Sequence, residues 1–109
     1  MNRKDEWKAI LLIFSGRPDP QWALNKNEIE NFMRLWNAAG GSDRHVHIPS
    51  LDGYKGIRLI HNNTEWVVHD SVITCFESGK SISRKDDKNK IENLLISSAP
   101  ADIRQLLNR

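Results

Sequence analysis

The chain has 109 residues, of which 39% are hydrophobic and 28% are charged. That length suits one domain around a single core, and the composition is typical of soluble globular proteins. The 16 basic and 14 acidic residues give a formal net charge of +2 and are mixed along the chain, whereas a nucleic-acid interface needs basic residues gathered on one face. We therefore expect a single domain over residues 1–109 that has no nucleic-acid partner.

The chain contains a single cysteine, Cys75, which excludes an internal disulfide and suits a reducing compartment. We interpret this cysteine as a small buried hydrophobe rather than a nucleophile. The basic N-terminus is followed by an apolar run over residues 9–14, which is shorter than the core of a signal peptide, about 7–15 residues, and far shorter than a membrane span. These features predict a cytoplasmic protein that does not associate with a membrane.

The first expected element is a strand from Trp7 to Phe14. Its apolar residues from Ala9 onward fall on both faces, which is typical of a central strand covered on both sides. The next stretch, Ser15 to Trp22, contains Pro18 and Pro20, which fix two backbone angles and remove two amide donors. We call this stretch the proline loop and expect it to be stiff and without regular pairing.

An amphipathic helix is expected to follow the proline loop. Asn25 is a good N-cap, and Glu28 lies three residues further on, as in a capping box. The apolar stripe at helical spacing consists of Ile29, Phe32, Met33 and Trp36. Gly40 and Gly41 end the helix, because glycine readily adopts the left-handed cap conformation, and residues 42–50 form a connecting loop.

Two runs rich in β-branched residues, 57–61 and 64–69, predict a hairpin. The connection is Asn62-Asn63, and asparagine tolerates the positive φ angles of a tight turn better than most residues. In that register Leu59 faces Trp66.

A third antiparallel strand is expected over residues 72–76, and Asp70-Ser71 before it is either a bulge or a tight turn. Residues 78–85 are polar and are interpreted as a loop. A second helix ends near Ser98, and a short helical turn begins at Pro100. The pattern predicts an α+β fold in the order βαβββα, with a mostly antiparallel sheet of about four strands, two main helices packed on it and a short C-terminal helical turn.

The proline loop carries the main candidate site. Arg17 presents a planar cationic fork that suits a carboxylate or phosphate, Asp19 is placed to orient that fork, and Trp22 offers a flat stacking face. Tyr54 is expected to lie beside this loop, because the turn that enters one strand can sit at the exit of its neighbour. We expect these four residues to bind an anionic small molecule or a protein partner. The alternative is structural: Arg17 pairs internally and Trp22 packs at the sheet edge.

The four histidines are the candidates for metal binding. His45 and His47 lie on one side of an extended segment, and His61 and His69 end neighbouring strands. No further ligand stands at a characteristic spacing from them, so solvated or edge histidines are the competing interpretation. The sequence therefore predicts no cofactor and leaves His45 and His47 as the metal candidates.

The sequence contains neither a Gly-x-Ser-x-Gly motif nor a phosphate-binding Gly-x-x-x-x-Gly-Lys loop. The main hypothesis is therefore a non-enzymatic binding or interaction domain that is monomeric or weakly dimeric. Two alternatives stay open. One is a small hydrolase or metal-dependent enzyme that uses Asp19 and the histidines, and the other is a homo-oligomer formed through a strand edge or through the apolar C-terminal residues Ile103, Leu106 and Leu107.

Two stretches of the chain resemble a pattern of small microbial domains of uncharacterised function. The pattern has Ser-Gly-Arg-Pro-x-Pro-x-Trp after a first strand and Leu-Gly-Tyr-x-Gly before a later strand. Residues 15–22 match it, and the second stretch departs from it by the insertion of Asp52, which gives Leu-Asp-Gly-Tyr-Lys-Gly. The resemblance implies no activity and supports the expectation that Arg17, Trp22 and Tyr54 belong together.

Overall fold

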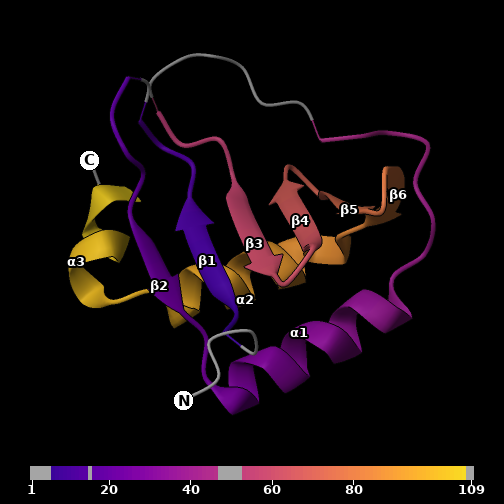
Figure 1. The fold of residues 1–109 in the computed structure, drawn as a ribbon, viewed down its shortest axis with the longest axis horizontal. Helices are drawn as coiled ribbons and strands as arrows, with labels where there is room; N and C mark the ends of the chain where they lie inside the picture. Colours follow the sequence, from indigo (N-terminus) through magenta and orange to yellow (C-terminus); the bar gives the residue numbers. More distant parts are fainter. Residues whose placement is uncertain (1–5, 15, 47–52, 108–109) are drawn as a thin grey trace.

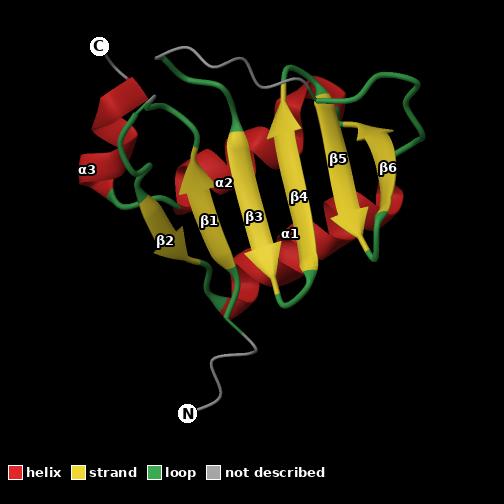
Figure 2. Ribbon diagram, turned by 45° about the horizontal axis from the view of Figure 1, so that its top comes forward, coloured by secondary structure: helices red, strands yellow, loops and turns green. Residues whose placement is uncertain are grey.

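The computed structural model describes residues 6–14, 16–46 and 53–107. One antiparallel sheet has helices packed on one of its faces (Figures 1 and 2). The strands, in chain order, are β1 (Lys8–Leu11), β2 (Gln21–Ala23), β3 (Ile57–His61), β4 (Thr64–His69), β5 (Val72–Glu77) and β6 (Lys80–Lys85). The helices are α1 (Lys26–Ala38), α2 (Lys90–Ser98) and α3 (Ala101–Arg104), with the 3-10 turns η2 (Asp87–Asn89) and η3 (Gln105–Leu107). None of the helices in the described part of the chain has the length and apolarity needed to cross a membrane.

The α+β class and the antiparallel sheet are confirmed, but the predicted number of strands and the element order were wrong. The sheet has six strands in the order β2-β1-β3-β4-β5-β6. Within the proline loop, β2 pairs with β1, with Ile10 opposite Gln21 and Lys8 opposite Ala23. Pro20 also contributes, because its carbonyl accepts a 2.9 Å hydrogen bond from the N–H of Leu11. A proline removes an amide donor but leaves the carbonyl acceptor in place, so the second half of the loop pairs despite its prolines.

The other unpredicted strand is β6, which lies at the far edge of the sheet. Its connection to β5 is a tight turn in which Ser78 and Gly79 have φ angles of 53° and 77°. An edge strand exposes much of its surface, and among the β6 residues only Ser83 is buried. This strand therefore lacks the apolar alternation by which strands are recognised in a sequence.

The predicted hairpin is confirmed, with Leu59 opposite Trp66. Asp70 and Ser71, which the sequence left open between a bulge and a turn, form a tight turn with φ angles of 51° and 70°. The predicted start of α1 is also confirmed, because Asn25 and the N3 residue Glu28 form both hydrogen bonds of a capping box.

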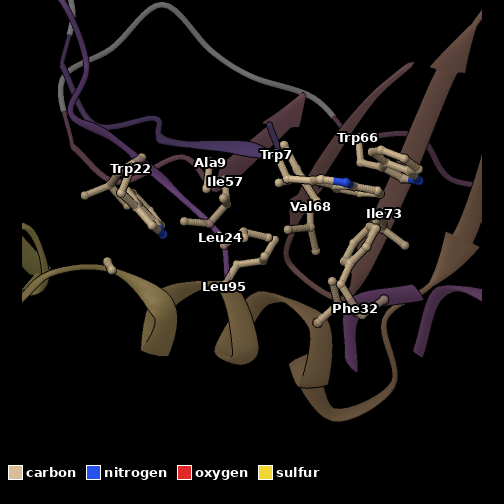
Figure 3. Close-up of a cluster of buried hydrophobic side chains, with 14 of the residues drawn as sticks. Trp7, Ala9, Trp22, Leu24, Phe32, Ile57, Trp66, Val68, Ile73 and Leu95 are labelled. Carbon is tan, nitrogen blue, oxygen red and sulfur yellow. The ribbon is translucent and has the colours of Figure 1, made fainter. Parts of the chain in front are cut away.

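The core lies between the sheet and the helices, as Figure 3 shows. Phe32 and Trp36 of α1 and Leu95 of α2 are buried against it. The expectation that the first strand is covered on both faces was wrong in part. Lys8 is exposed and Ile10 is half-buried, because the helices cover only one face of the sheet.

The C-terminal ends of β1 and β4 lie at the same end of the sheet. Strands β1 and β4 both pair with β3 in the antiparallel sense, so they run in the same direction and end at the same edge. Residues 53–56, which lead into β3, continue this pairing beyond the end of β1: Lys55 N–H donates to Leu12 O over 2.7 Å and Gly53 N–H donates to Ile13 O over 2.9 Å. The candidate functional residues lie around this end.

Candidate functional site

The acidic and aromatic members of the proline loop are engaged in holding the fold. Asp19 Oδ1 accepts hydrogen bonds from the backbone N–H groups of Ile13, at 3.0 Å, and Phe14, at 2.7 Å. Trp22 is only 8% exposed, and its indole N–H donates a 2.8 Å hydrogen bond to Ser98 Oγ at the end of α2. The stacking face that the sequence suggested for Trp22 thus lies within the core.

Arg17 differs from those two residues because its side chain is exposed. Its guanidinium carbon lies 3.7 Å from the centroid of the Phe14 ring, which is the arrangement of a cation–π contact. Asp19 and Trp22 therefore hold the fold together through hydrogen bonds, whereas Arg17 contacts the Phe14 ring at the surface. The binding of a ligand by this loop stays a prediction.

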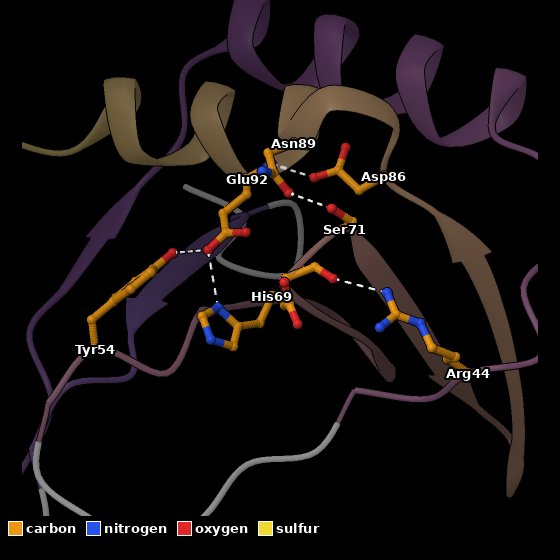
Figure 4. Close-up of polar contacts among 8 residues, drawn as sticks. Arg44, Tyr54, His69, Ser71, Asp86, Asn89 and Glu92 are labelled. Carbon is orange, nitrogen blue, oxygen red and sulfur yellow. Dashed lines mark hydrogen bonds and ion pairs between the residues drawn. The ribbon is translucent and has the colours of Figure 1, made fainter.

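Tyr54 lies in the segment that pairs with Leu12 and Ile13 beyond the end of β1, and its expected place beside Arg17 stays a prediction. Its side chain, however, turns toward α2. The hydroxyl of Tyr54 donates a hydrogen bond to Glu92 Oε2, and the same carboxylate oxygen lies 3.2 Å from His69 Nδ1 (Figure 4). The rings of Tyr54 and His69 meet edge to face, with their centroids 5.3 Å apart. We call Tyr54, His69 and Glu92 the carboxylate cluster.

The N-terminus of α2 holds Glu92 in place. Asp86 is 1% exposed, and its two carboxylate oxygens accept the backbone N–H groups of Ile91, at 2.7 Å, and Glu92, at 3.0 Å. These are N–H groups of the first helical turn that have no partner within the helix. Burial raises the pKa of the Asp86 carboxyl, and the two backbone hydrogen bonds oppose that shift.

The pKa of Tyr54 is also raised, well above its usual value. Burial is the largest cause, followed by the hydrogen bond to Glu92 and by the negative charges of Glu92 and Asp86. Tyr54 is therefore a hydrogen-bond donor across the physiological pH range, and Glu92 is its acceptor.

Gly56 allows the segment that carries Tyr54 to approach the end of β4. Its φ angle is 111°, and a Cβ atom at this position would lie 2.4 Å from Val68 O and 2.7 Å from His69 Cβ. Only glycine fits such a close approach with such a φ angle. The contact between Tyr54 and His69 thus depends on this glycine.

A hollow of about 190 Å³ lies beside His69. It is lined by Arg44, His45, Val46, His69, Asp70 and Val72. Arg44 is held at its rim, because Arg44 Nη2 donates a 3.0 Å hydrogen bond to the carbonyl of Asp70 (Figure 4). The side chain of His69 is 31% exposed, so a small molecule can reach it. We call this hollow the Arg44 hollow.

The segment that carries Arg44 is fixed to the sheet by three hydrogen bonds. Ser42 N–H donates to Ser83 O over 3.0 Å, a 2.7 Å hydrogen bond joins His45 Nδ1 and Ser83 Oγ, and Val46 N–H donates to Thr74 Oγ1 over 3.2 Å. Thr74 and Ser83 alternate with residues that face the helices, so they point from the opposite face of the sheet. The segment therefore crosses the β6 edge and lines that face.

The metal hypothesis gains no support from the described residues. His45 bonds to Ser83, and the ring of His61 stacks on Trp7 with centroids 4.2 Å apart. His47 lies outside the described residues. In the described part of the chain, no three histidine, cysteine or acidic residues are grouped so that they could hold a metal ion.

Sequence reasoning missed the residues that meet at this end of the sheet. Glu92 was one polar residue of an amphipathic helix, and Arg44 was one charge in a loop. His69 was a metal candidate at the end of a strand, and its pairing with Glu92 was not predicted. Cys75 is buried as predicted, and burial is the main cause of the raised pKa of its thiol.

Comparisons with protein-family models, with curated proteins and with solved structures find no match to this chain.

Proposed function

We propose that this domain binds a small oxyanion, a phosphate or carboxylate group, in the Arg44 hollow. The observation that carries the proposal is the lining of this hollow, which combines an arginine with two histidines. Arginine holds oxyanions through paired N–H groups, and protonated histidine adds a further charged donor. The proposal keeps the anionic ligand expected from the sequence and moves its site from Arg17 to Arg44.

The supporting groups behind this lining also favour binding. The side chains of Arg44, His45 and His69 each make one hydrogen bond to a protein group. A side chain that is already fixed loses less conformational entropy when a ligand binds. Asp70 is the acid that lines the hollow, and its negative charge offsets the positive charge of Arg44. The net charge of the hollow is therefore positive only when a histidine is protonated.

The test is isothermal titration calorimetry with inorganic phosphate. We expect saturable binding to the wild type and a loss of affinity of about tenfold or more in Arg44→Gln, because a charge-assisted pair contributes about 1.5–3 kcal/mol. Arg34→Gln is the matched control, since Arg34 is an exposed α1 residue that bonds only to Asn31 among the described residues. It removes the same charge and should leave the affinity unchanged.

Arg17→Gln separates the two anion hypotheses. Arg17 is exposed, and among the described residues its guanidinium has only the Phe14 ring as a partner, so its N–H groups are available to an anion. A loss of phosphate binding in Arg17→Gln with none in Arg44→Gln would move the site back to the proline loop. No binding in the wild type would reject both.

A further inference from the structure

We propose that the first half of β6, Lys80 to Ile82, is a docking site for an extended acidic segment of a partner protein, which adds to the sheet as a further strand. We call this half the free β6 edge; Figure 2 shows β6 at the edge of the sheet. Three features meet there: backbone groups without partners, two exposed apolar side chains and a positive charge. The hollow at this end of the hairpin shares no lining residue with the Arg44 hollow.

The second half of β6 already accepts a strand from the same chain. Residues 40–42 run beside it in the antiparallel sense. Ser42 N–H donates to Ser83 O over 3.0 Å, and Lys85 N–H donates to Gly40 O over 2.7 Å. Ser83 and Lys85 therefore direct backbone groups away from β5, and this edge of the sheet is able to pair with an added segment.

The free β6 edge has no such partner among the described residues. Every second residue of a strand directs its backbone groups to the same side, so Ser81 also directs its N–H and C=O away from β5. Lys80, Ser81 and Ile82 are exposed, and in the described part of the chain no backbone hydrogen bond reaches the outer side of Ser81. Unpaired groups at a sheet edge are the template for strand addition.

Two apolar side chains flank this edge on opposite faces of the sheet. Phe76 lies opposite Ser81, and Ile82 lies opposite Cys75. Phe76 and Ile82 are the exposed large hydrophobic residues of the described part of the chain, at 42% and 56%. A hollow of about 380 Å³ lies beside Phe76 and Ser81. Because serine is small and strands lie about 4.8 Å apart, an aromatic side chain on an added strand can reach the Phe76 ring across Ser81.

The charge of the edge selects an acidic partner. Strand β6 contains Lys80, Arg84 and Lys85 and no acidic residue. Lys80 is exposed and forms no ion pair within the described part of the chain. Opposite charges on neighbouring strands stabilise the pairing and like charges destabilise it. An acid opposite Lys80 therefore favours docking.

A second copy of this chain fits the edge less well than a peptide segment. Two β6 strands side by side would bring together two strands that carry only positive charges. The free edge is also short, and a stable protein interface buries about 1,200 Å² or more. An antiparallel peptide, the sense of every strand pair in this sheet, would place an apolar residue opposite Ile82, an aromatic residue opposite Ser81 and an acid opposite Lys80.

The probe is the peptide acetyl-Thr-Val-Tyr-Glu-Glu-amide, which has this order of residues. It is titrated into ¹⁵N-labelled protein and followed by NMR of the backbone amides. We expect saturable shifts centred on residues 80–82 and hydrogen exchange of the Ser81 amide slowed by about tenfold or more at saturation, because the amide gains a hydrogen bond. The control peptide acetyl-Thr-Val-Tyr-Lys-Lys-amide should bind about tenfold more weakly, because its charges repel Lys80.

Three variants test the three features of the edge. Ser81→Pro removes the outward N–H, which a proline on an edge strand lacks without losing a bond to the inner neighbour, and should lower the peptide affinity by about tenfold. Because proline also restrains the strand itself, Ile82→Ser is the second variant, and it should lower the affinity by about fivefold through the lost apolar contact. Lys80→Gln should weaken binding by about threefold, whereas Lys8→Gln, at an exposed position of β1, should leave it unchanged.

The outcomes decide for or against strand addition. Absence of saturable binding by the acidic peptide, or equal binding of the acidic and basic peptides, would overturn the proposal. Full affinity in both Ser81→Pro and Ile82→Ser would do the same. Shifts of residues 80–82 that grow with protein concentration in the absence of peptide would show that a second copy occupies the edge, and would also overturn it.

Discussion

His69 Nδ1 and Glu92 Oε2 lie 3.2 Å apart, although the two residues are separated by 23 positions in the chain. Their contact joins the end of strand β4 to the first turn of helix α2. Glu92 is buried and lies beside the Tyr54 hydroxyl, so its charge is met by donors from two segments. Buried polar groups of this kind are costly when one partner is removed. The contact therefore links the stability of the fold to the proposed binding site.

Tyr54→Phe should lower the free energy of unfolding by about 1–2 kcal/mol, because Glu92 loses a donor. The variant should also change the response to alkali. The pKa of folded Tyr54 lies above its usual value of about 10, so the unfolded state loses the phenol proton first and stability falls as the pH rises beyond about 10. Urea unfolding at a series of alkaline pH values should show a shallower fall for the variant. Equal slopes would contradict the burial of this hydroxyl.

Asp86→Ala should destabilise the protein by about 1–2 kcal/mol, as the loss of a helix cap does. The carboxylate accepts two backbone N–H groups of α2, and alanine leaves both without that partner. Asp87→Ala is the matched control, since Asp87 is the exposed neighbour and its loss should change stability by no more than about 0.5 kcal/mol. Equal effects of the two variants in chemical denaturation would show that general charge, rather than capping, matters at this turn.

Gly56→Ala should cost more than about 2 kcal/mol, because the new Cβ meets a backbone oxygen and the residue has a positive φ angle. The same substitution at Gly40 meets no atom within 4 Å and should be nearly neutral. Thermal unfolding of the two variants provides the comparison. A stable Gly56→Ala protein would contradict the close approach of this segment to β4.

Trp22→Phe should destabilise the protein by about 1–3 kcal/mol through the lost contact volume and the lost hydrogen bond to Ser98. Arg17→Ala, in the same loop, should change the free energy of unfolding by no more than about 0.5 kcal/mol, because its side chain is exposed. The reverse order of these effects would show that Arg17, and not Trp22, holds the loop.

Local patterns predicted the parts of this fold that local chemistry determines. The capping box at Asn25, the hairpin that places Leu59 opposite Trp66 and the short helix after Pro100 all follow from neighbouring residues. Strand β2 was missed because its three residues, which follow a proline, are too few to show the alternation of apolar and polar residues that marks a strand. Strand β6 was missed because an edge strand is polar, although Ser78-Gly79 was a turn signal that pointed to it.

The candidate site was harder to predict because long-range contacts assemble it. Tyr54, His69 and Glu92 come from three separate segments, and no short spacing in the sequence connects them. The proximity of Tyr54 to the exit of β1 was predictable from strand order. Its partner was not, since Glu92 becomes distinctive only when α2 docks on the sheet and buries it.

An oxyanion bound in the Arg44 hollow would lie beside the residues that line it, Arg44, His69 and Asp70 among them. The most direct measurement is a titration of the wild-type protein with phosphate, followed by two-dimensional NMR of the backbone amides and of the arginine and histidine side chains. We expect saturable shifts centred on Arg44, His69 and Asp70, with Arg17 unaffected. Shifts centred on Arg17 and its loop, or no saturable shift at any residue, would contradict this expectation.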